Sequence, residues 1–125
     1  MTNNCKKIAN IPLVDQNIVS HISAFRNSVS ATFLIQEFDE NTRMDLEELY
    51  AVIQIEDWQR TAAVAHRARG LCLLLGAMRL AHLLERIEKN SLDHKSTSQL
   101  LRAALELDFV LDNTLQEMGL LVKID

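Results

Sequence analysis

The sequence contains little of what turn-rich or cross-linked folds require. Its 125 residues include three glycines, one proline and two cysteines. So few glycines and prolines argue against a turn-rich β-sandwich. Cys5 and Cys72 are too few and too far apart for a disulfide framework, and no C-x-x-C spacing suggests a structural zinc or a redox pair. The cysteine usage indicates a reducing compartment. The composition, 48% hydrophobic and 24% charged, is typical of a single helical domain.

Long apolar runs are also missing. The longest, Leu71 to Leu75, is far shorter than the roughly 20 residues that cross a bilayer. The first ten residues carry two lysines but lack the apolar stretch of a secretory signal. Thirteen basic and 17 acidic residues give a net charge of −4, which argues against broad attraction to nucleic acid or anionic lipid. We therefore expect a soluble, cytoplasmic protein without nucleic-acid partners or direct membrane contact.

Apolar residues recur at helical spacing along most of the chain. The pattern predicts a short helix over residues 14–25, with Asp15 in its first turn, and a long helix over residues 28–53. The stripe of the long helix consists of Ile35, Phe38, Thr42, Leu46, Leu49 and Ile53. In the last predicted helix, which begins near Thr97, the stripe consists of Leu100, Ala104, Leu107, Leu111 and Met118.

Cap residues set the other predicted boundaries. Asp57 suits the N-cap of a helix over residues 58–75, and Gly76 suits its C-cap before a helix over residues 78–89. Residues 90–98 predict a surface loop, and Gly119 is expected to end the last helix. Four substantial helices with short connections predict an all-α fold, an antiparallel up-down-up-down four-helix bundle with a short extra N-terminal helix.

The domain organisation that follows is simple. Residues 1–10 form a polar tail and residues 11–125 one helical domain, with the bundle over about 28–118. No feature predicts an obligate oligomer, so we expect a monomer.

Helical bundles often bind metals, but the ligand spacing is absent. No histidine has a glutamate three residues before it, and no two histidines lie four residues apart. We therefore predict no metal site and interpret His21, His82 and His94 as surface or boundary residues.

His66 has different neighbours. At about 100° per residue, the core face of its helix consists of Thr61, Val64, Ala65, Ala68, Cys72 and Leu75. His66 is then predicted on the outer face together with Gln59, Ala62, Ala63, Arg69, Gly70 and Leu73.

Gly70 and the arginines each allow two interpretations. A glycine within a helix costs about 1 kcal/mol relative to alanine, so Gly70 either leaves room beside His66 or lets another helix approach closely. Residues 58–84 contain four arginines and no acidic residue. The arginines are either a solvated face paired with acids of neighbouring helices, or a site where His66 is the nucleophile and Arg69 stabilises phosphoryl oxygens.

These residues resemble a known family, the histidine-containing phosphotransfer (HPt) domains of phosphorelays. The family signature is approximately A-H-x-L-K-G-S-x-x-x-[LI]-G-A, and the segment Ala65 to Ala77 reads AHRARGLCLLLGA. Six positions match, namely Ala65, His66, Gly70, Leu75, Gly76 and Ala77. The resemblance covers roughly residues 28–118.

The resemblance implies a phosphorelay intermediate. His66 would accept a phosphoryl group from the phospho-aspartate of a receiver domain and pass it to another receiver, with a hybrid histidine kinase upstream. The chain would have no kinase activity and no cofactor of its own, since the receiver would supply Mg²⁺. Arg69 stands where the family usually has lysine and keeps the positive charge. Ala68 replaces the usual leucine, and Leu71 stands where a small or hydroxylic residue is common, two departures that bear on the transfer rate.

A receiver-docking patch is a further prediction. Leu73 lies seven residues after His66 and shares its face, so we expect Leu73, with Ile18 or Ile22 of the first helix, to contact the receiver, along with Ala62, Ala63 and Arg67. The alternative is that Leu73 is buried under the first helix. Two other functions stay open: an HPt-like adaptor or inhibitor that binds a receiver or kinase without transfer, and a helical scaffold or dimerisation module.

Overall fold

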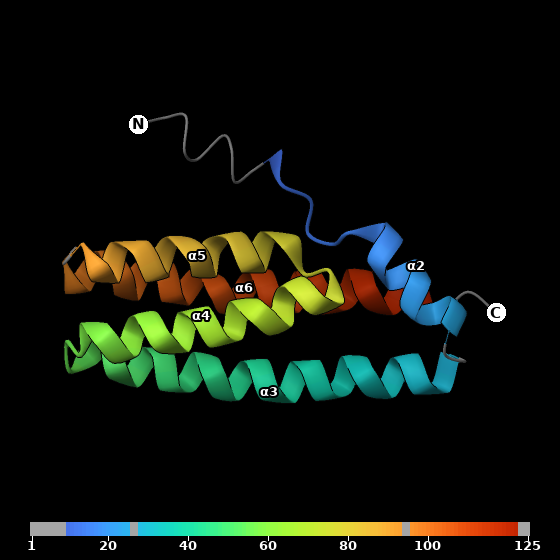
Figure 1. The fold of residues 1–125 in the computed structure, drawn as a ribbon, viewed down its shortest axis with the longest axis horizontal. Helices are drawn as coiled ribbons and strands as arrows, with labels where there is room; N and C mark the ends of the chain where they lie inside the picture. Colours follow the sequence, from blue (N-terminus) through green and yellow to red (C-terminus); the bar gives the residue numbers. More distant parts are fainter. Residues whose placement is uncertain (1–9, 26–27, 94–95, 123–125) are drawn as a thin grey trace.

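The computed structural model describes residues 10–25, 28–93 and 96–122, and five helices account for nearly all of them (Figure 1). They are α2 (Gln16–Phe25), α3 (Ser28–Gln54), α4 (Trp58–Leu75), α5 (Met78–Leu92) and α6 (Thr97–Val122). None of the described residues forms a strand.

The helices α3 to α6 run alternately in opposite directions, so each pair that is consecutive in the chain is antiparallel (Figure 1). α3 packs against α4 and α6, and α5 packs against the same two helices. The short α2 covers one end of this bundle and contacts α6 and α3. The fold is therefore the predicted all-α bundle with an extra N-terminal helix.

The predicted stripes form the core. Of the α3 stripe, only Ile35 is less than fully buried, and all five residues of the α6 stripe are buried. The predicted core face of α4 is also confirmed, since each of its six residues is buried. One of them, Cys72, has its thiol pKa raised to about 12 by burial, as expected of a packing residue rather than a reactive one.

Both caps of α4 are as predicted. The side chain of Asp57 accepts a hydrogen bond from the backbone N–H of Arg60 at 3.1 Å. Gly76 ends the helix in the left-handed conformation, at φ 82°, and its N–H points to the carbonyl oxygens of Cys72 and Leu73. The two caps therefore define where α4 begins and ends, and with that the direction in which each of its side chains points.

The segment before α2 is bound to the turn between α4 and α5. The N–H of Asp15 donates to the Gly76 carbonyl at 2.8 Å, and the N–H of Met78 donates to the Leu13 carbonyl at 3.1 Å. Arg79 Nε donates to the Ile11 carbonyl at 2.8 Å. These three bonds tie the N-terminal segment to the turn that ends α4.

Several predicted boundaries were wrong. Residues 90–92 were expected in a loop but belong to α5, where Ser91 is buried and its hydroxyl donates to the Glu88 carbonyl. α6 continues through Gly119 to Val122, because a glycine ends a helix only where the chain turns away. Asp15 precedes α2 instead of lying in its first turn, and its carboxylate accepts from the N–H of Asn17.

Candidate functional site

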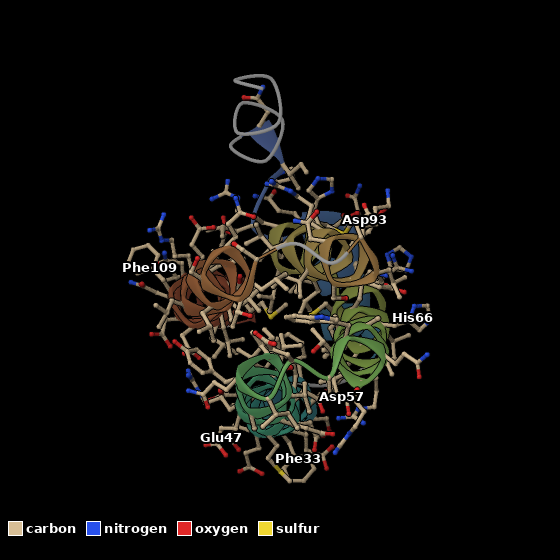
Figure 2. The ribbon with its side chains drawn as sticks, turned by 90° about the vertical axis from the view of Figure 1, so that its left-hand side faces the viewer. Phe33, Glu47, Asp57, His66, Asp93 and Phe109 are labelled. Carbon is tan, nitrogen blue, oxygen red and sulfur yellow. The ribbon has the colours of Figure 1, made fainter. Side chains whose placement is uncertain are left out.

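His66 lies in the middle of α4 and points away from the bundle (Figure 2). Its side chain is 64% exposed, as the helical spacing predicts. The residues before and after it show why: Ala65 is fully buried and Ala68 nearly so, and both belong to the core face, so His66 between them is directed outward. The ring is open to a partner molecule.

A carboxylate of the neighbouring helix contacts this ring. His66 Nδ1 lies 3.4 Å from Oε1 and 3.3 Å from Oε2 of Glu88 on α5. A carboxylate only accepts, so in the neutral imidazole this contact favours the tautomer in which Nδ1–H donates a hydrogen bond to Glu88 and Nε2 keeps its lone pair. The Glu88 side chain is itself only 24% exposed, which limits its movement. This arrangement makes Nε2 the available nucleophile and gives the ring a fixed partner.

Arg69 lies one turn after His66 and also faces α5. Its Nη1 is 3.7 Å from Glu85 and 4.0 Å from Glu88. Both distances exceed those of a hydrogen bond, so the carboxylates attract the guanidinium without occupying its donors. A cation with free donors close to His66 can interact with the oxygens of an anionic group on the ring.

Arg67 was predicted to contact a partner, but its guanidinium is directed toward α3. It donates to Asp45 from Nε and Nη2, at 3.2 and 2.7 Å, and to Glu48 from Nη2 at 2.7 Å. The pKa of Arg67 is raised, first by its hydrogen bond with Glu48 and then by that with Asp45. The pKa of Glu48 is lowered, first by the hydrogen bond from Arg67 and then by that from Arg60. For Arg60 and Arg67, pairing with acids of a neighbouring helix is therefore the correct interpretation.

The two small residues expected beside His66 differ from each other. Ala63 is exposed, as predicted. Ala62 is 8% exposed, so its expected place on the open face was wrong. Ala62 precedes Arg69 by seven residues and shares its side of the helix, where α5 packs, and a short side chain there is covered by the neighbouring helix.

Gly70 leaves open space beside the histidine. A Cβ atom built on it would meet no atom within 4 Å, and the residue is exposed. The interpretation in which Gly70 lets another helix of the bundle approach closely was therefore wrong. The structure agrees with the alternative, room for a group that approaches His66.

Three residues of the predicted docking patch, Leu73, Ile18 and Ile22, lie near the end of α4. Leu73 is 43% exposed, which contradicts its burial under the first helix. Ile22 packs partly against the core, and Ile18 lies over Gly76, where its Cβ is 3.1 Å from the position of an added Cβ. Ile18 and Ile22 are partly exposed, so all three offer some apolar surface.

The sequence did not single out Glu85 or Glu88. These two residues are three apart on α5 and so share one side of it. That spacing was a usable signal, because they are the only acidic residues of this helix. Which helix they would face depends on how α4 and α5 pack, and helical periodicity does not contain that information.

The remaining histidines form no further cluster. His21 is exposed and His82 is partly buried, whereas His94 lies outside the described residues. No group of three or more His, Cys, Asp or Glu side chains among the described residues could hold a metal ion. In the same part of the chain, no helix combines the length and apolar character needed to span a membrane.

The sequence of this chain matches a known family, and its fold is similar to that of a solved structure. Residues 34–119 match the model of the Hpt domain family. Among solved structures, the fold is similar to that of histidine-containing phosphotransfer protein B (HptB) from Pseudomonas aeruginosa PAO1, with a TM-score of 0.67 at 20% sequence identity over 90% of this chain and 92% of that one. No curated protein is significantly similar in sequence. The family match covers more than half of the chain and includes the helix that carries His66, and on this basis the chain belongs to the Hpt domain family.

Proposed function

We propose that this protein is a phosphorelay intermediate in which His66 accepts a phosphoryl group from a receiver-domain aspartate and passes it to the aspartate of another receiver. The observation that supports this most is the contact between His66 Nδ1 and the Glu88 carboxylate, which favours a proton on Nδ1 and so leaves the lone pair of the exposed ring on Nε2. Membership of the Hpt domain family supports the same reaction class.

In the accepting step, the Nε2 lone pair forms a bond to phosphorus while the bond from phosphorus to the aspartyl oxygen breaks. The electron pair of the broken bond leaves with the aspartate carboxylate. The Nδ1 proton stays on the ring, which gains positive charge as the N–P bond forms, and the Glu88 carboxylate at 3.3 Å stabilises that charge. Passing the group on reverses each of these changes.

Two other residues contribute to the proposed reaction. Arg69 stabilises the oxygens of the transferring group, because no hydrogen bond to a described side chain occupies its guanidinium and its ion pairs are long. Gly70 admits the phosphoryl group and the receiver, because nothing lies within 4 Å of where its side chain would be. His66 is thus the phosphoacceptor, Arg69 the stabilising cation and Gly70 the access position.

The partners in this proposal are receiver domains and a hybrid histidine kinase. The receiver contacts Ala63, Leu73 and the exposed parts of Ile18 and Ile22, and it supplies the Mg²⁺ of the reaction. The chain acts as a monomer and binds no nucleic acid.

The test is phosphate transfer from a panel of phosphorylated receiver domains in the presence of Mg²⁺. We expect acid-labile, base-stable label on the wild type and none on His66→Gln. His82→Gln, which removes a partly buried histidine of α5, is the matched control and should be labelled like the wild type. Label on His66→Gln would contradict the assignment. Receiver binding without any label would favour the adaptor instead, and the absence of both would favour a scaffold.

The docking part of the proposal has its own test. Leu73→Asp should weaken receiver binding about tenfold, as for an apolar contact residue near the centre of an interface, with unchanged helical circular dichroism. Leu74 is 71% exposed and, seven residues after Arg67, faces the α3 side, so Leu74→Asp is the control and should change affinity little. Equal weakening by both variants would remove Leu73 from the contact surface.

A further inference from the structure

The seam between α3 and α6 lies on the side of the bundle opposite His66. In the view along the bundle, Phe109 of α6 lies at the left edge and Glu47 of α3 at the lower left, whereas His66 lies at the right (Figure 2). A helix bound along this seam leaves the histidine uncovered. Docking at the seam is therefore independent of phosphoryl transfer.

A hollow of about 230 Å³ opens along this seam and is lined by Arg43, Leu46, Glu47, Tyr50 and Asp108. Buried Leu46 and half-buried Tyr50 give it an apolar floor. On α6, Leu105 is 57% exposed and lies one turn before Asp108, so it extends the apolar surface from the hollow outward. The hollow is smaller than typical small-molecule pockets, which measure roughly 300 to 1,000 Å³. Its size suits one large apolar side chain from a macromolecule.

The carboxylates at the two seams of α3 differ. At the α3–α4 seam, both Asp45 and Glu48 pair with arginines of α4. At the hollow, Glu47 and Asp108 are both exposed and neither forms an ion pair with a described residue.

The arginine of the hollow is already engaged by other carboxylates. Arg43 donates from Nε to Asp39 at 2.7 Å and from Nη2 to Asp112 at 2.6 Å. Glu47 and Asp108 thus border a hollow with an apolar floor and form no ion pair with Arg43, an arrangement that favours a positively charged occupant.

The charge of the surrounding helices points the same way. α3 and α6 together carry ten acidic residues and two arginines, a formal net charge of −8. A second copy that presented the same face would bring two such surfaces together, and like charges across an interface are costly. Nucleic acid and anionic lipid are repelled for the same reason.

We propose that the α3–α6 seam is a docking site for a cationic amphipathic helix of a protein partner. One large apolar side chain of that helix enters the hollow over Leu46 and Tyr50, and its lysines or arginines pair with Glu47 and Asp108. Because the seam lies opposite His66 (Figure 2), the partner can hold the protein by one side while the histidine side stays free.

The first experiment locates binding with a defined probe. A synthetic 18-residue helical peptide of leucine and lysine, with leucines on one face, is titrated into the ¹⁵N-labelled full chain. We expect amide shifts over residues 43–50 and 105–112 and little change over 63–73. A matched peptide with glutamate in place of lysine should not bind. Shifts centred on the His66 face would overturn the proposal.

Variants then separate docking from general charge attraction. Glu47→Gln with Asp108→Asn should weaken peptide binding about tenfold, as expected for two ion pairs at a partly exposed site. Glu37→Gln with Glu106→Gln changes the net charge equally at exposed positions outside the hollow and should weaken binding by no more than about twofold. Equal weakening by both pairs would show nonspecific attraction. If sedimentation velocity shows a dimer and Leu105→Gln dissociates it, the occupant of the seam is a second copy of the chain. This result, like equal weakening by both pairs, would overturn the proposal.

Discussion

The two halves of the bundle carry opposite charge. α4 and α5 together have six basic and two acidic residues, a formal net charge of +4, whereas α3 and α6 have two basic and ten acidic residues, or −8. The net charge of the whole chain, −4, hides this division. His66 lies on the basic half, and both acidic residues of that half, Glu85 and Glu88, lie beside it or beside Arg69.

This division of charge determines where an anionic group can approach the bundle. A phosphorylated partner carries negative charge, so the acidic half repels it and the basic half attracts it. The attraction is local, because Arg60 and Arg67 are already paired with carboxylates of α3. Arg69 keeps donors available near the histidine. The basic half therefore places an open nucleophile beside a cation with available donors, Arg69.

The largest expected loss of stability comes from a substitution at the turn that joins α4 and α5. Gly76→Ala places a side chain at φ 82°, which costs about 1 to 2 kcal/mol. The new Cβ would also lie 3.1 Å from the Cβ of Ile18 and 3.3 Å from the Asp15 carbonyl, which adds about 1 kcal/mol. We expect urea unfolding to show a loss of about 2 to 3 kcal/mol. A loss of only about 1 kcal/mol would mean that the N-terminal segment moves away freely from this turn, and a loss below about 0.5 kcal/mol would contradict the left-handed conformation at residue 76.

The role of Gly76 was visible in the sequence, because a glycine after a run of helical spacing predicts a left-handed C-cap. The core faces were visible for the same reason, since each is set by the periodicity of one helix. Ala65 and Ala68, for example, were placed correctly inside and His66 outside. These features depend on a single helix and the cap that follows it.

Features that depend on the packing of two helices could not be predicted from the sequence. Burial of Ala62 and the contact between His66 and Glu88 both follow from how α5 packs beside α4. The direction of Arg67 follows from α3 in the same way. Gly119 shows the limit for caps as well, since the same residue type lies within α6 instead of ending it. Periodicity gives the faces of a helix but not its neighbours.

The charge of Glu88 is expected to contribute to the reaction at His66. Glu88→Gln keeps an oxygen that accepts a hydrogen bond from Nδ1–H of His66 but removes the negative charge that stabilises the ring during transfer. We expect the transfer rate to fall about tenfold, with receiver affinity unchanged. Rapid-quench measurement of labelled protein provides the rate. Glu106→Gln on the acidic half is the control, and an equal fall in both variants would mean that total charge matters and the contact does not.

Two glycines give a matched pair across the halves. Gly70 in α4 and Gly119 in α6 both have open space around an added Cβ. Alanine at either position should stabilise the protein by about 0.5 to 1 kcal/mol in thermal unfolding, because alanine favours the helix. Only Gly70→Ala should slow phosphoryl transfer, by a few-fold, since only Gly70 lies beside His66. Unchanged transfer in Gly70→Ala would show that this position needs no open space.

The smallest effect concerns the ion pairs that join the halves, and it depends on pH. Hydrogen bonds from Arg67 and Arg60 lower the pKa of Glu48 below its ordinary value of 4.5. A carboxylate with a lowered pKa in the folded state contributes stability above its unfolded pKa, and this contribution is lost as pH falls through the folded value. Wild type should therefore exceed Glu48→Gln in melting temperature at pH 7, and the difference should shrink progressively below about pH 4.5. Glu37→Gln, on the same helix but without an ion pair to a described residue, is the control and should show a smaller change. A constant Glu48→Gln difference between pH 7 and pH 3 would show that these pairs do not couple the two halves.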